Sequence, residues 1–426
     1  MRSQNPMLMA VVAACILSVA ACGGEGTPIP ELPAAQVDLP DPEPLSGWRR
    51  WAIDLVLEGR VWQGARSGFV ALVARDGRLI HASLAGYADI EAELPMAIDT
   101  RFQMASMTKP ITAVAAMILV EEGRLHLDDP VARYLPAFAD MQVAILDDEG
   151  EVVGKTPQSP EMKIRHLLSF ASGIAGSGFE PTPLGQQWRD DGIYAGKGSL
   201  AQRIERLPHL LLLEQPGTQW RYGAALDVMA RIVEIAADEP LEAFMKRRIF
   251  DPLGMHSTYY GKDVPADAPL ARLYTQDESG KLVPAPGPTL RPPDWTPGGS
   301  GLVSTAPDYM RFALMLWNEG AYNDTRILKA ETVQTMKRLE VASGVLEIFE
   351  IEGLGFGLGV SVVADQARTV MASRNGDFWW SGAYGTHFWV SPETGVALVV
   401  LQQNEMSETG GPPIVPFLVQ QLALTD

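Results

Sequence analysis

Several patterns that mark known classes of hydrolases and binding proteins are missing from this sequence. No serine has glycine at both the −2 and +2 positions, which excludes the nucleophile elbow of α/β-hydrolases. The six histidines show neither HExxH nor zinc-type spacing, and no GxGxxG or Walker pattern precedes a predicted helix. The motifs therefore give no support to metal, dinucleotide or nucleotide chemistry.

Basic residues and cysteines are also scarce. The 34 Lys and Arg residues stand against 52 Asp and Glu, for a net charge of −18. This balance argues against a nucleic-acid partner, which would need clustered basic side chains. The two cysteines, Cys15 and Cys22, both lie near the N-terminus, so the rest of the chain has no disulfide available to it. With 46% hydrophobic residues, we expect stability to come from a sizeable core.

An apolar stretch opens the chain. Arg2 precedes the run Met7 to Ala21, which is shorter than the roughly 20 residues of a membrane span and is typical of a secretory signal. The sequence Val19-Ala20-Ala21-Cys22-Gly23 resembles the bacterial lipobox, in which the cysteine becomes the lipidated first residue. We predict a signal peptide over residues 1–21 and an exported protein, lipid-anchored through Cys22 to the bacterial cell envelope and facing the periplasm.

Residues 22–46 form a predicted tether. Between Gly23 and Ser46 lie six prolines and five acidic residues with no basic one, a composition that resists packing. The folded domain is therefore expected over residues 47–426.

Strand patterns occur at both ends of this domain. Phe69 to Ala74 and Leu79 to Ser83 flank Asp76-Gly77, a hairpin signal, and His387 to Val390 and Val396 to Leu401 are strand-like as well. Helical patterns lie between them. We predict an α+β fold, with one antiparallel sheet built from both chain ends, flanking helices and a mostly helical lobe over about residues 120–295.

Within the lobe, two segments receive specific predictions. Phe179 to Lys197 is rich in Gly, Pro and aromatic residues without a period, which predicts a loop beside a cleft. Leu200 to Leu213 is predicted to be a helix that ends before Pro216-Gly217.

The candidate nucleophile is Ser106, in Ser106-Met107-Thr108-Lys109. Apolar residues at helical spacing continue from Ile111 to Leu119, so Ser106 is expected at the amino end of a buried helix. Side chains three residues apart share one helix face, which brings Lys109 next to Ser106. A partly desolvated lysine can take the serine proton, and the positive end of the helix dipole favours an oxyanion.

Five sets of segments, the first of which contains Ser106, carry a family resemblance. They are Phe102 to Pro110, Leu119 to Gly123 with Leu127 to Pro130, Leu167-Leu168 with Ser172-Gly173, Pro252 to Met255, and Gly301 to Thr305. In this order they resemble the class C β-lactamase-related serine hydrolases, and most of all the SxxK carboxylesterases. The resemblance runs from about residue 48 to 420 and implies a β-lactamase/transpeptidase-like fold, with Ser106 as nucleophile and Lys109 as the activating lysine.

The second element of this family is a Tyr-x-Asn loop, matched by Tyr222-Gly223-Ala224 except at the last position. The resemblance implies that Tyr222 relays protons between the serine and the leaving group. Ala224 departs from the pattern and lacks the amide often used to hold an amide-bearing substrate such as a β-lactam.

The third element is a strand that carries Lys-Thr-Gly in penicillin-recognising relatives. Its best match is Trp380-Ser381-Gly382-Ala383, which we expect to bind substrate, with Tyr384-Gly385-Thr386 continuing the strand. The resemblance implies an oxyanion hole formed by the backbone N–H groups of Ser106 and Ala383. Trp380 replaces a cation that would hold a penicillin carboxylate, which favours neutral, hydrophobic esters.

These expectations describe a two-step acyl transfer on Ser106 that needs no metal or cofactor and acts on a small ester or amide. Two alternatives remain open. The same site could serve a DD-peptidase or β-lactamase, or the chain could be a catalytically silent, lipid-anchored module that binds the cell wall or a partner protein.

Overall fold

The computed structural model describes residues 45–176, 182–195, 197–265, 267–287, 290, 295–342, 344–345, 351–369, 371–405 and 414–424. The predicted signal peptide, Cys22 and most of the tether lie outside the described residues. The described part contains no helix with the length and apolar content needed to cross a membrane.

The main sheet joins the two ends of the chain. Among the described residues, eight strands pair antiparallel in the order β13-β14-β15-β16-β17-β1-β2-β3. The two ends of the chain meet where β1 pairs with β17, in register from Val70↔Leu401 to Arg75↔Val396. The strands are β1 (Gly68–Arg75), β2 (Arg78–Asp89), β3 (Leu94–Pro95), β13 (Leu354–Phe356), β14 (Ser361–Val363), β15 (Phe378–Ser381), β16 (His387–Ser391) and β17 (Val396–Leu401). The expected sheet built from both chain ends is confirmed.

The hairpin between β1 and β2 turns where the sequence predicts it. Asp76 and Gly77 both have positive φ, at 50° and 78°, the conformation that tight hairpin turns require. Strands β1 and β17 are buried along nearly their whole length, because helices cover both faces of the sheet.

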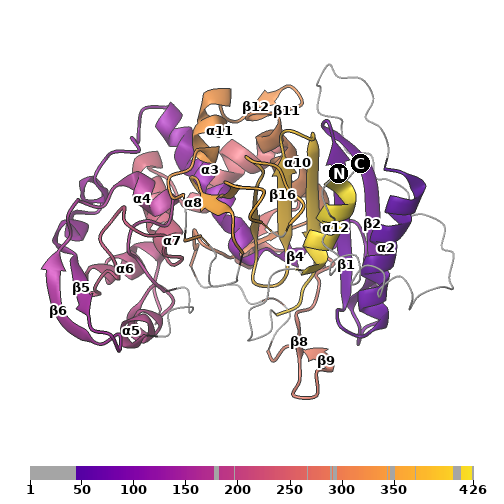
Figure 1. Cartoon of the computed structure of the whole chain (residues 1–426), viewed down its shortest axis with the longest axis horizontal. Coiled ribbons are helices and arrows are strands. Elements are labelled where there is room, and N and C mark those ends of the chain that lie inside the picture. The colour runs from indigo at the N-terminus through magenta and orange to yellow at the C-terminus, as the bar shows by residue number, and fades with distance from the viewer. Residues whose placement is uncertain are drawn as a thin grey trace.

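Two neighbouring residues of β16 show which helix covers each face of the sheet. Phe388 packs on Tyr309 of α10 (Ala306–Trp317), with ring centroids 5.4 Å apart. His387 packs on Phe417, in α12 (Ile414–Leu424), at 5.7 Å. Since successive strand residues point to opposite faces, α10 lies on one face of the sheet and α12 on the other. Helix α2 (Gly47–Trp62) packs beside α12 and on β1 and β2 (Figure 1).

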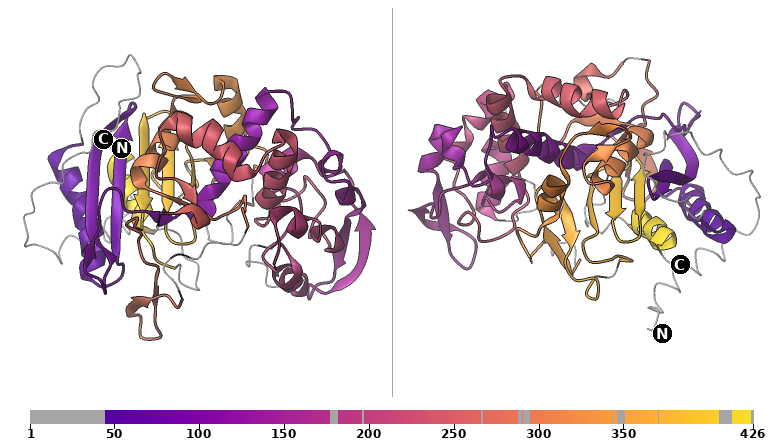
Figure 2. Two further views of the ribbon diagram at one scale, coloured as in Figure 1. Left: turned by 180° about the vertical axis from the view of Figure 1, so that it is seen from behind. Right: turned by 90° about the horizontal axis from the view of Figure 1, so that it is seen from above.

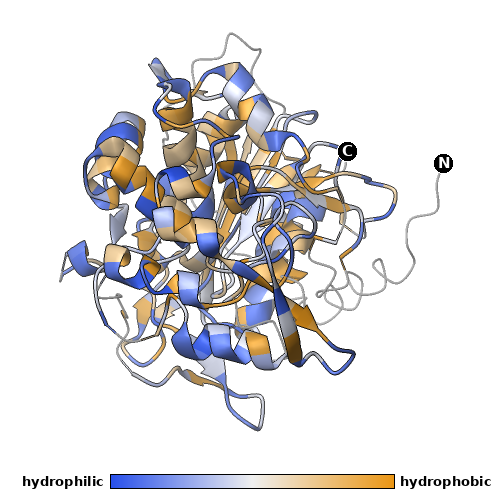
Figure 3. Ribbon diagram, turned by 90° about the vertical axis from the view of Figure 1, so that its left-hand side faces the viewer, coloured by the Kyte–Doolittle hydropathy of each residue, from blue (hydrophilic) through white to orange (hydrophobic). Residues whose placement is uncertain are grey.

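A long helix connects the sheet to the helical part of the molecule. Helix α3 (Thr108–Glu121) is buried from Thr108 to Leu119 and packs on α7 (Ala225–Ala237) and α8 (Leu241–Met245). Figure 2 shows α3 running through the middle of the molecule, and Figure 3 shows surface helices that alternate hydrophobic and hydrophilic residues around hydrophobic strands.

Short elements complete the structure. The helices are α4 (Ile164–Leu168), α5 (Pro183–Asp191), α6 (Leu200–Ile204), α9 (Asp251–Leu253) and α11 (Ala330–Lys337). The strands are β4 (Phe102–Gln103), β5 (Gln142–Leu146), β6 (Val152–Pro157), β7 (Tyr259–Tyr260), β8 (Tyr274–Gln276), β9 (Leu282–Pro284), β10 (Leu302–Ser304), β11 (Ala321–Tyr322) and β12 (Thr325–Arg326). Helices α4 to α6 and the hairpin β5-β6 lie at the end of the molecule opposite α2 (Figure 1).

Three sequence expectations about local structure are wrong. The stretch predicted as a loop contains α5, because Thr182 caps its first turn by accepting from Gly185 N and Pro183 suits that turn. The helix predicted from Leu200 ends at Ile204 and gives way to a 3-10 turn that contains Pro208. The residues after Ser381 form a turn and not a continued strand, since Gly385 has a φ of 83°.

Candidate active site

Ser106 lies in the 3-10 turn Ala105–Met107, directly before α3. Ala105 has a φ of 47°, a left-handed conformation that costs about 1 kcal/mol for a residue with a Cβ. The strained residue therefore immediately precedes the predicted nucleophile, at the point where the chain turns from β4 into the helix.

Lys109 follows one turn later and is only 4% exposed. Its Nζ donates to Ser106 Oγ at 3.1 Å and to the carbonyl oxygen of Gly299 at 2.7 Å. The same Nζ lies 4.7 Å from the centroid of the Tyr222 ring, a cation–π distance. The structure thus brings together Ser106, Lys109 and Tyr222, the catalytic residues that the sequence predicts.

Asp227 is a further charged residue near this group, and no sequence motif predicts a role for it. It is fully buried in the first turn of α7, where its Oδ1 accepts from Gly299 N at 2.9 Å and its Oδ2 from the Tyr194 hydroxyl at 3.3 Å. Burial raises the pKa of Asp227, and the positive charge of Lys109 opposes that rise. Gly299 therefore links Lys109 to Asp227: its carbonyl oxygen accepts from Lys109, and its N–H donates to the Asp227 carboxyl group.

Gly299 lies in a position where a side chain would displace its neighbours. A Cβ there would lie 2.9 Å from Asp227 Oδ2 and 3.3 Å from Lys109 Nζ. A side chain there would push the Asp227 carboxylate or the Lys109 ammonium group away, so glycine suits the close approach of this loop to both. The sequence signal for Asp227 was an acidic residue among the apolar residues that begin α7. Tyr194 left no such signal, since it lies in a stretch expected to be a loop.

Aromatic side chains hold Tyr222 from several sides. Its ring centroid lies 4.9 Å from that of Phe170, 5.8 Å from Trp220 and 5.5 Å from Trp380. Trp380 also meets Phe356 edge-on at 5.2 Å. We call Phe170, Trp220, Tyr222, Phe356 and Trp380 the aromatic cluster; it fixes the ring of Tyr222 beside Lys109.

Strand β15 sends consecutive side chains to opposite sides. Trp380 faces the aromatic cluster, while Trp379 stacks on Trp389 at 5.7 Å and meets Phe417 of α12. The hydroxyl group of Ser381 bonds to His387 Nδ1 at 2.8 Å. Of the residues predicted to bind substrate, Trp380 therefore directs its side chain to the cluster, whereas that of Ser381 is engaged by His387.

The turn that follows β15 packs tightly against the nucleophile segment. A Cβ on Gly382 would lie 2.4 Å from the carbonyl oxygen of Met104 and 3.4 Å from Ala105 Cβ. Thr386 Oγ1 donates to the same Met104 oxygen at 3.0 Å. Ala383 follows Gly382 and is exposed. The contacts of Gly382 bring the backbone here close to the segment that carries Ser106. The role of Ala383 as the second oxyanion donor stays a prediction.

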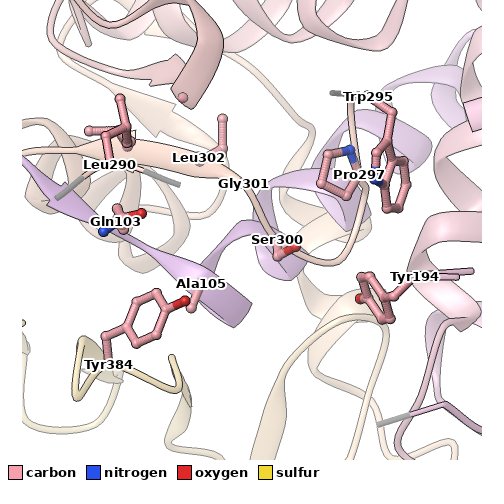
Figure 4. A pocket seen from close by; sticks show the side chains of 12 residues that line it. Gln103, Ala105, Tyr194, Leu290, Trp295, Pro297, Ser300, Gly301, Leu302 and Tyr384 are labelled. Atoms are coloured by element: carbon pink, nitrogen blue, oxygen red, sulfur yellow. The ribbon is translucent and has the colours of Figure 1, made fainter. Parts of the chain in front are cut away.

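A cavity of about 240 Å³ adjoins Ala105. Its lining includes Tyr194, Leu290, Trp295, Ser300 and Tyr384, as Figure 4 shows. Tyr194 also bonds to Asp227, so the cavity and the charged group share one wall. In the described residues, no group of three or more His, Cys, Asp and Glu side chains is arranged to hold a metal ion.

Known proteins are similar to this chain in sequence. The chain matches the Beta-lactamase family over residues 53–413. It is 35% identical over 353 residues to an uncharacterized protein of Mycobacterium tuberculosis, which covers 80% of this chain and 86% of the relative. It is 30% identical over 383 residues to esterase EstB of Burkholderia gladioli, covering 84% of this chain and 92% of EstB.

A solved structure agrees with these relatives. EstCE1, described as a hydrolase with promiscuous acyltransferase activity, aligns with a TM-score of 0.75 at 28% identity, covering 89% of this chain and 98% of EstCE1. The β-lactamase/transpeptidase-like fold and the family expected from the sequence are confirmed. The chain belongs to the Beta-lactamase family and is a serine hydrolase of that family.

Proposed function

We propose that this hydrolase is a carboxylesterase that forms an acyl-enzyme on Ser106. The observation that carries the proposal is the hydrogen bond of 3.1 Å between Ser106 Oγ and the buried Lys109 Nζ. A serine hydroxyl becomes nucleophilic only when a neighbouring group takes its proton, and Lys109 is held for that task by Gly299.

The substrate class follows from the surroundings of Ser106. Trp380, 4% exposed, stands where a cation would hold the carboxylate of a penicillin or peptide, and Ala224, fully buried, offers no side-chain amide. The adjoining cavity has Leu290, Trp295 and Tyr384 among its walls. These features favour a neutral ester with an apolar group over an anionic substrate.

The reaction has two steps in this proposal. Ser106 loses its proton to Lys109 and attacks the ester carbonyl carbon, and the N–H groups of Ser106 and Ala383 stabilise the resulting oxyanion. The proton held by Lys109 passes through the Tyr222 hydroxyl group to the alcohol oxygen as the C–O bond breaks. Water then attacks the acyl-enzyme, giving the carboxylic acid and free Ser106.

We extend the proposal to the location of the enzyme. The lipobox-like sequence at Cys22 supports export and a lipid anchor in the bacterial cell envelope, with residues 22–46 as the tether and the domain facing the periplasm. The described body would then act close to a membrane surface.

The test compares two substrates and one active-site label. We expect the protein to hydrolyse p-nitrophenyl butyrate, to turn over nitrocefin slowly or not at all, and to gain a fluorophosphonate adduct on Ser106 detected by mass spectrometry. Ser106→Ala should lose both hydrolysis and adduct. Ser279→Ala, whose hydroxyl bonds to Asp277 in the β8-β9 turn, is the control and should keep both.

Two results would overturn the proposal. Rapid nitrocefin turnover without ester hydrolysis would assign a β-lactamase or peptidase activity to the same site. Absence of any serine adduct in the unmodified protein would favour a silent binding module.

A further inference from the structure

Helix α2 carries exposed tryptophans that the fold does not use. Trp48, Trp51 and Trp62 are 59%, 52% and 74% exposed, although tryptophan is a residue that usually lies mostly buried. At 3.6 residues per turn, their positions fall within about 60° around the helix axis. They form one stripe, about 20 Å long at 1.5 Å per residue, which we call the Trp48/Trp51/Trp62 face.

The inner side of α2 already has its partners. Ile53 and Leu57 are fully buried, and the helix packs on β1, β2 and α12. The tryptophans are therefore not needed to attach the helix to the sheet. Trp48 is held by a cation–π contact with Arg49, whose guanidinium carbon lies 5.3 Å from the ring centroid.

The position of α2 in the chain identifies the surface that fits this face. The helix begins at Gly47, directly after the predicted tether, whose other end is Cys22 at the close of the apolar run Met7 to Ala21. A proline-rich segment of this length reaches at most about 70 Å, so a lipid at Cys22 would keep α2 near the bilayer.

We propose that the Trp48/Trp51/Trp62 face seats the enzyme on the interfacial layer of a lipid bilayer. Tryptophan suits that layer because its ring is apolar and its indole N–H can stay hydrated. In the structure α2 lies at the end of the molecule opposite hairpin β5-β6 (Figure 1), so this seating turns the helical lobe away from the membrane.

The charge of the protein indicates which kind of lipid surface this face would bind. The net charge is −18, and Glu58, on the same side of α2 as Trp51, is exposed. Burial and the neighbouring Asp54 raise the pKa of Glu58, as expected for an acid at the edge of an apolar surface. A zwitterionic surface, such as phosphatidylcholine, therefore fits this face better than an anionic one.

The experiment measures tryptophan fluorescence of the full chain reconstituted into phosphatidylcholine vesicles with brominated acyl chains, which quench indoles that enter the bilayer. We expect quenching in the unmodified protein and a loss of about half of it or more in the triple variant Trp48→Gln, Trp51→Gln, Trp62→Gln. Adding phosphatidylglycerol should weaken the quenching at low salt.

Controls separate this result from misfolding and from dimer formation. Val153→Gln, on the exposed hairpin at the far end, should leave quenching unchanged, and the triple variant should keep its activity on a soluble ester, since α2 lies outside the active site. Equal quenching of the triple variant and the unmodified protein would overturn the proposal. So would a dimer, seen by light scattering, that dissociates in the triple variant, because the face would then bind a second copy.

Discussion

At the residue scale, Tyr222 has two roles that mutation can separate: its hydroxyl group is predicted to transfer a proton, and its ring packs in the aromatic cluster. The ring is fixed by Phe170, Trp220 and Trp380, while only the hydroxyl group can move a proton. A substitution that removes the hydroxyl alone therefore tests the predicted relay without disturbing the aromatic cluster.

We expect Tyr222→Phe to lower kcat on p-nitrophenyl butyrate by about a hundredfold or more, the usual contribution of a positioned proton donor. Its free energy of unfolding should stay within about 0.5 kcal/mol of the unmodified protein, because the ring contacts remain. Steady-state kinetics and urea unfolding measure the two effects. Unchanged kcat would assign the proton transfer to another group and leave Tyr222 as a packing residue.

His387 gives a second residue-scale prediction, on pH. It is fully buried, and burial lowers its pKa to about 3. A histidine in the unfolded chain titrates near 6.5, so below that pH it is protonated in the unfolded chain, whereas His387 stays neutral in the folded protein. The stability that His387 contributes is therefore present above about pH 6.5 and is lost as the pH falls, by about 1.4 kcal/mol per pH unit.

We expect the free energy of unfolding to drop between pH 7 and pH 5 by about 2 kcal/mol more in the unmodified protein than in His387→Asn, whose amide can replace the bond to Ser381. Urea unfolding at both pH values measures this difference. Asp377, whose pKa is raised to about 6 by burial, has the opposite sign but is present in both proteins. Equal pH dependence of the two proteins would contradict the prediction.

At the element scale, the turn between β15 and β16 sets the distance between the predicted oxyanion donors. Gly382 N donates to the Thr386 carbonyl group at 2.8 Å, and Gly385 N to the Gly382 carbonyl group at 2.9 Å, which closes the turn around Ala383. Thr386 Oγ1 then fastens it to Met104, two residues before the nucleophile. Thr386 is therefore a positioning residue for the site.

Thr386→Val keeps the shape of the side chain and removes this bond. We expect kcat to fall by about tenfold or more with little change in KM, because a displaced oxyanion donor weakens transition-state binding most. Thr386→Ser, which retains the hydroxyl group, should recover most of the loss. If Thr386→Val and the unmodified protein had equal kcat, the turn would be positioned by its backbone bonds alone.

How far the sequence predicts these elements depends on the distance between the residues involved. Ser106 and Lys109 are three residues apart on a helix, so their contact follows from local geometry. Lys109 and Gly299 are 190 residues apart, and Gly299 and Asp227 are 72 apart, so these contacts exist only once the fold has formed. The sequence therefore predicts the nucleophile and its lysine but not the loop that holds the lysine.

Local propensity also misleads at the site. Tyr384 and Thr386 favour strands, yet the left-handed Gly385 makes a turn, because the backbone there must close onto Gly382 and Met104. The helix α5 was missed for the opposite reason: its hydrophobic residues are few, and the cap at Thr182 decides where it begins.

At the scale of the whole molecule, the site lies where sheet and helical lobe meet. Helix α3 passes between them, with Ser106 before its first turn, the end of β15 on one side and the segment of Tyr222 and α7 on the other. Each part of the site therefore comes from a different region of the chain, and all of them lie within a protein that carries a net charge of −18.

This charge should add to the preference of the site for neutral over anionic esters. The summed negative potential lowers the local concentration of anionic substrates, whereas neutral ones are unaffected. We expect the ratio of kcat/KM for a neutral p-nitrophenyl ester to that for an anionic one, such as the succinate monoester, to fall about threefold or more when the salt concentration rises from about 10 mM to 500 mM, because salt screens the potential.

Matched measurements on both esters at each salt concentration isolate the effect, since changes in the enzyme itself affect both alike. The neutral ester should show nearly constant kcat/KM, and the increase should come from the anionic one. A ratio independent of salt would mean that discrimination against anions arises from contacts at short range, with Trp380 and the apolar cavity walls as the discriminating groups, and not from the charge of the whole molecule.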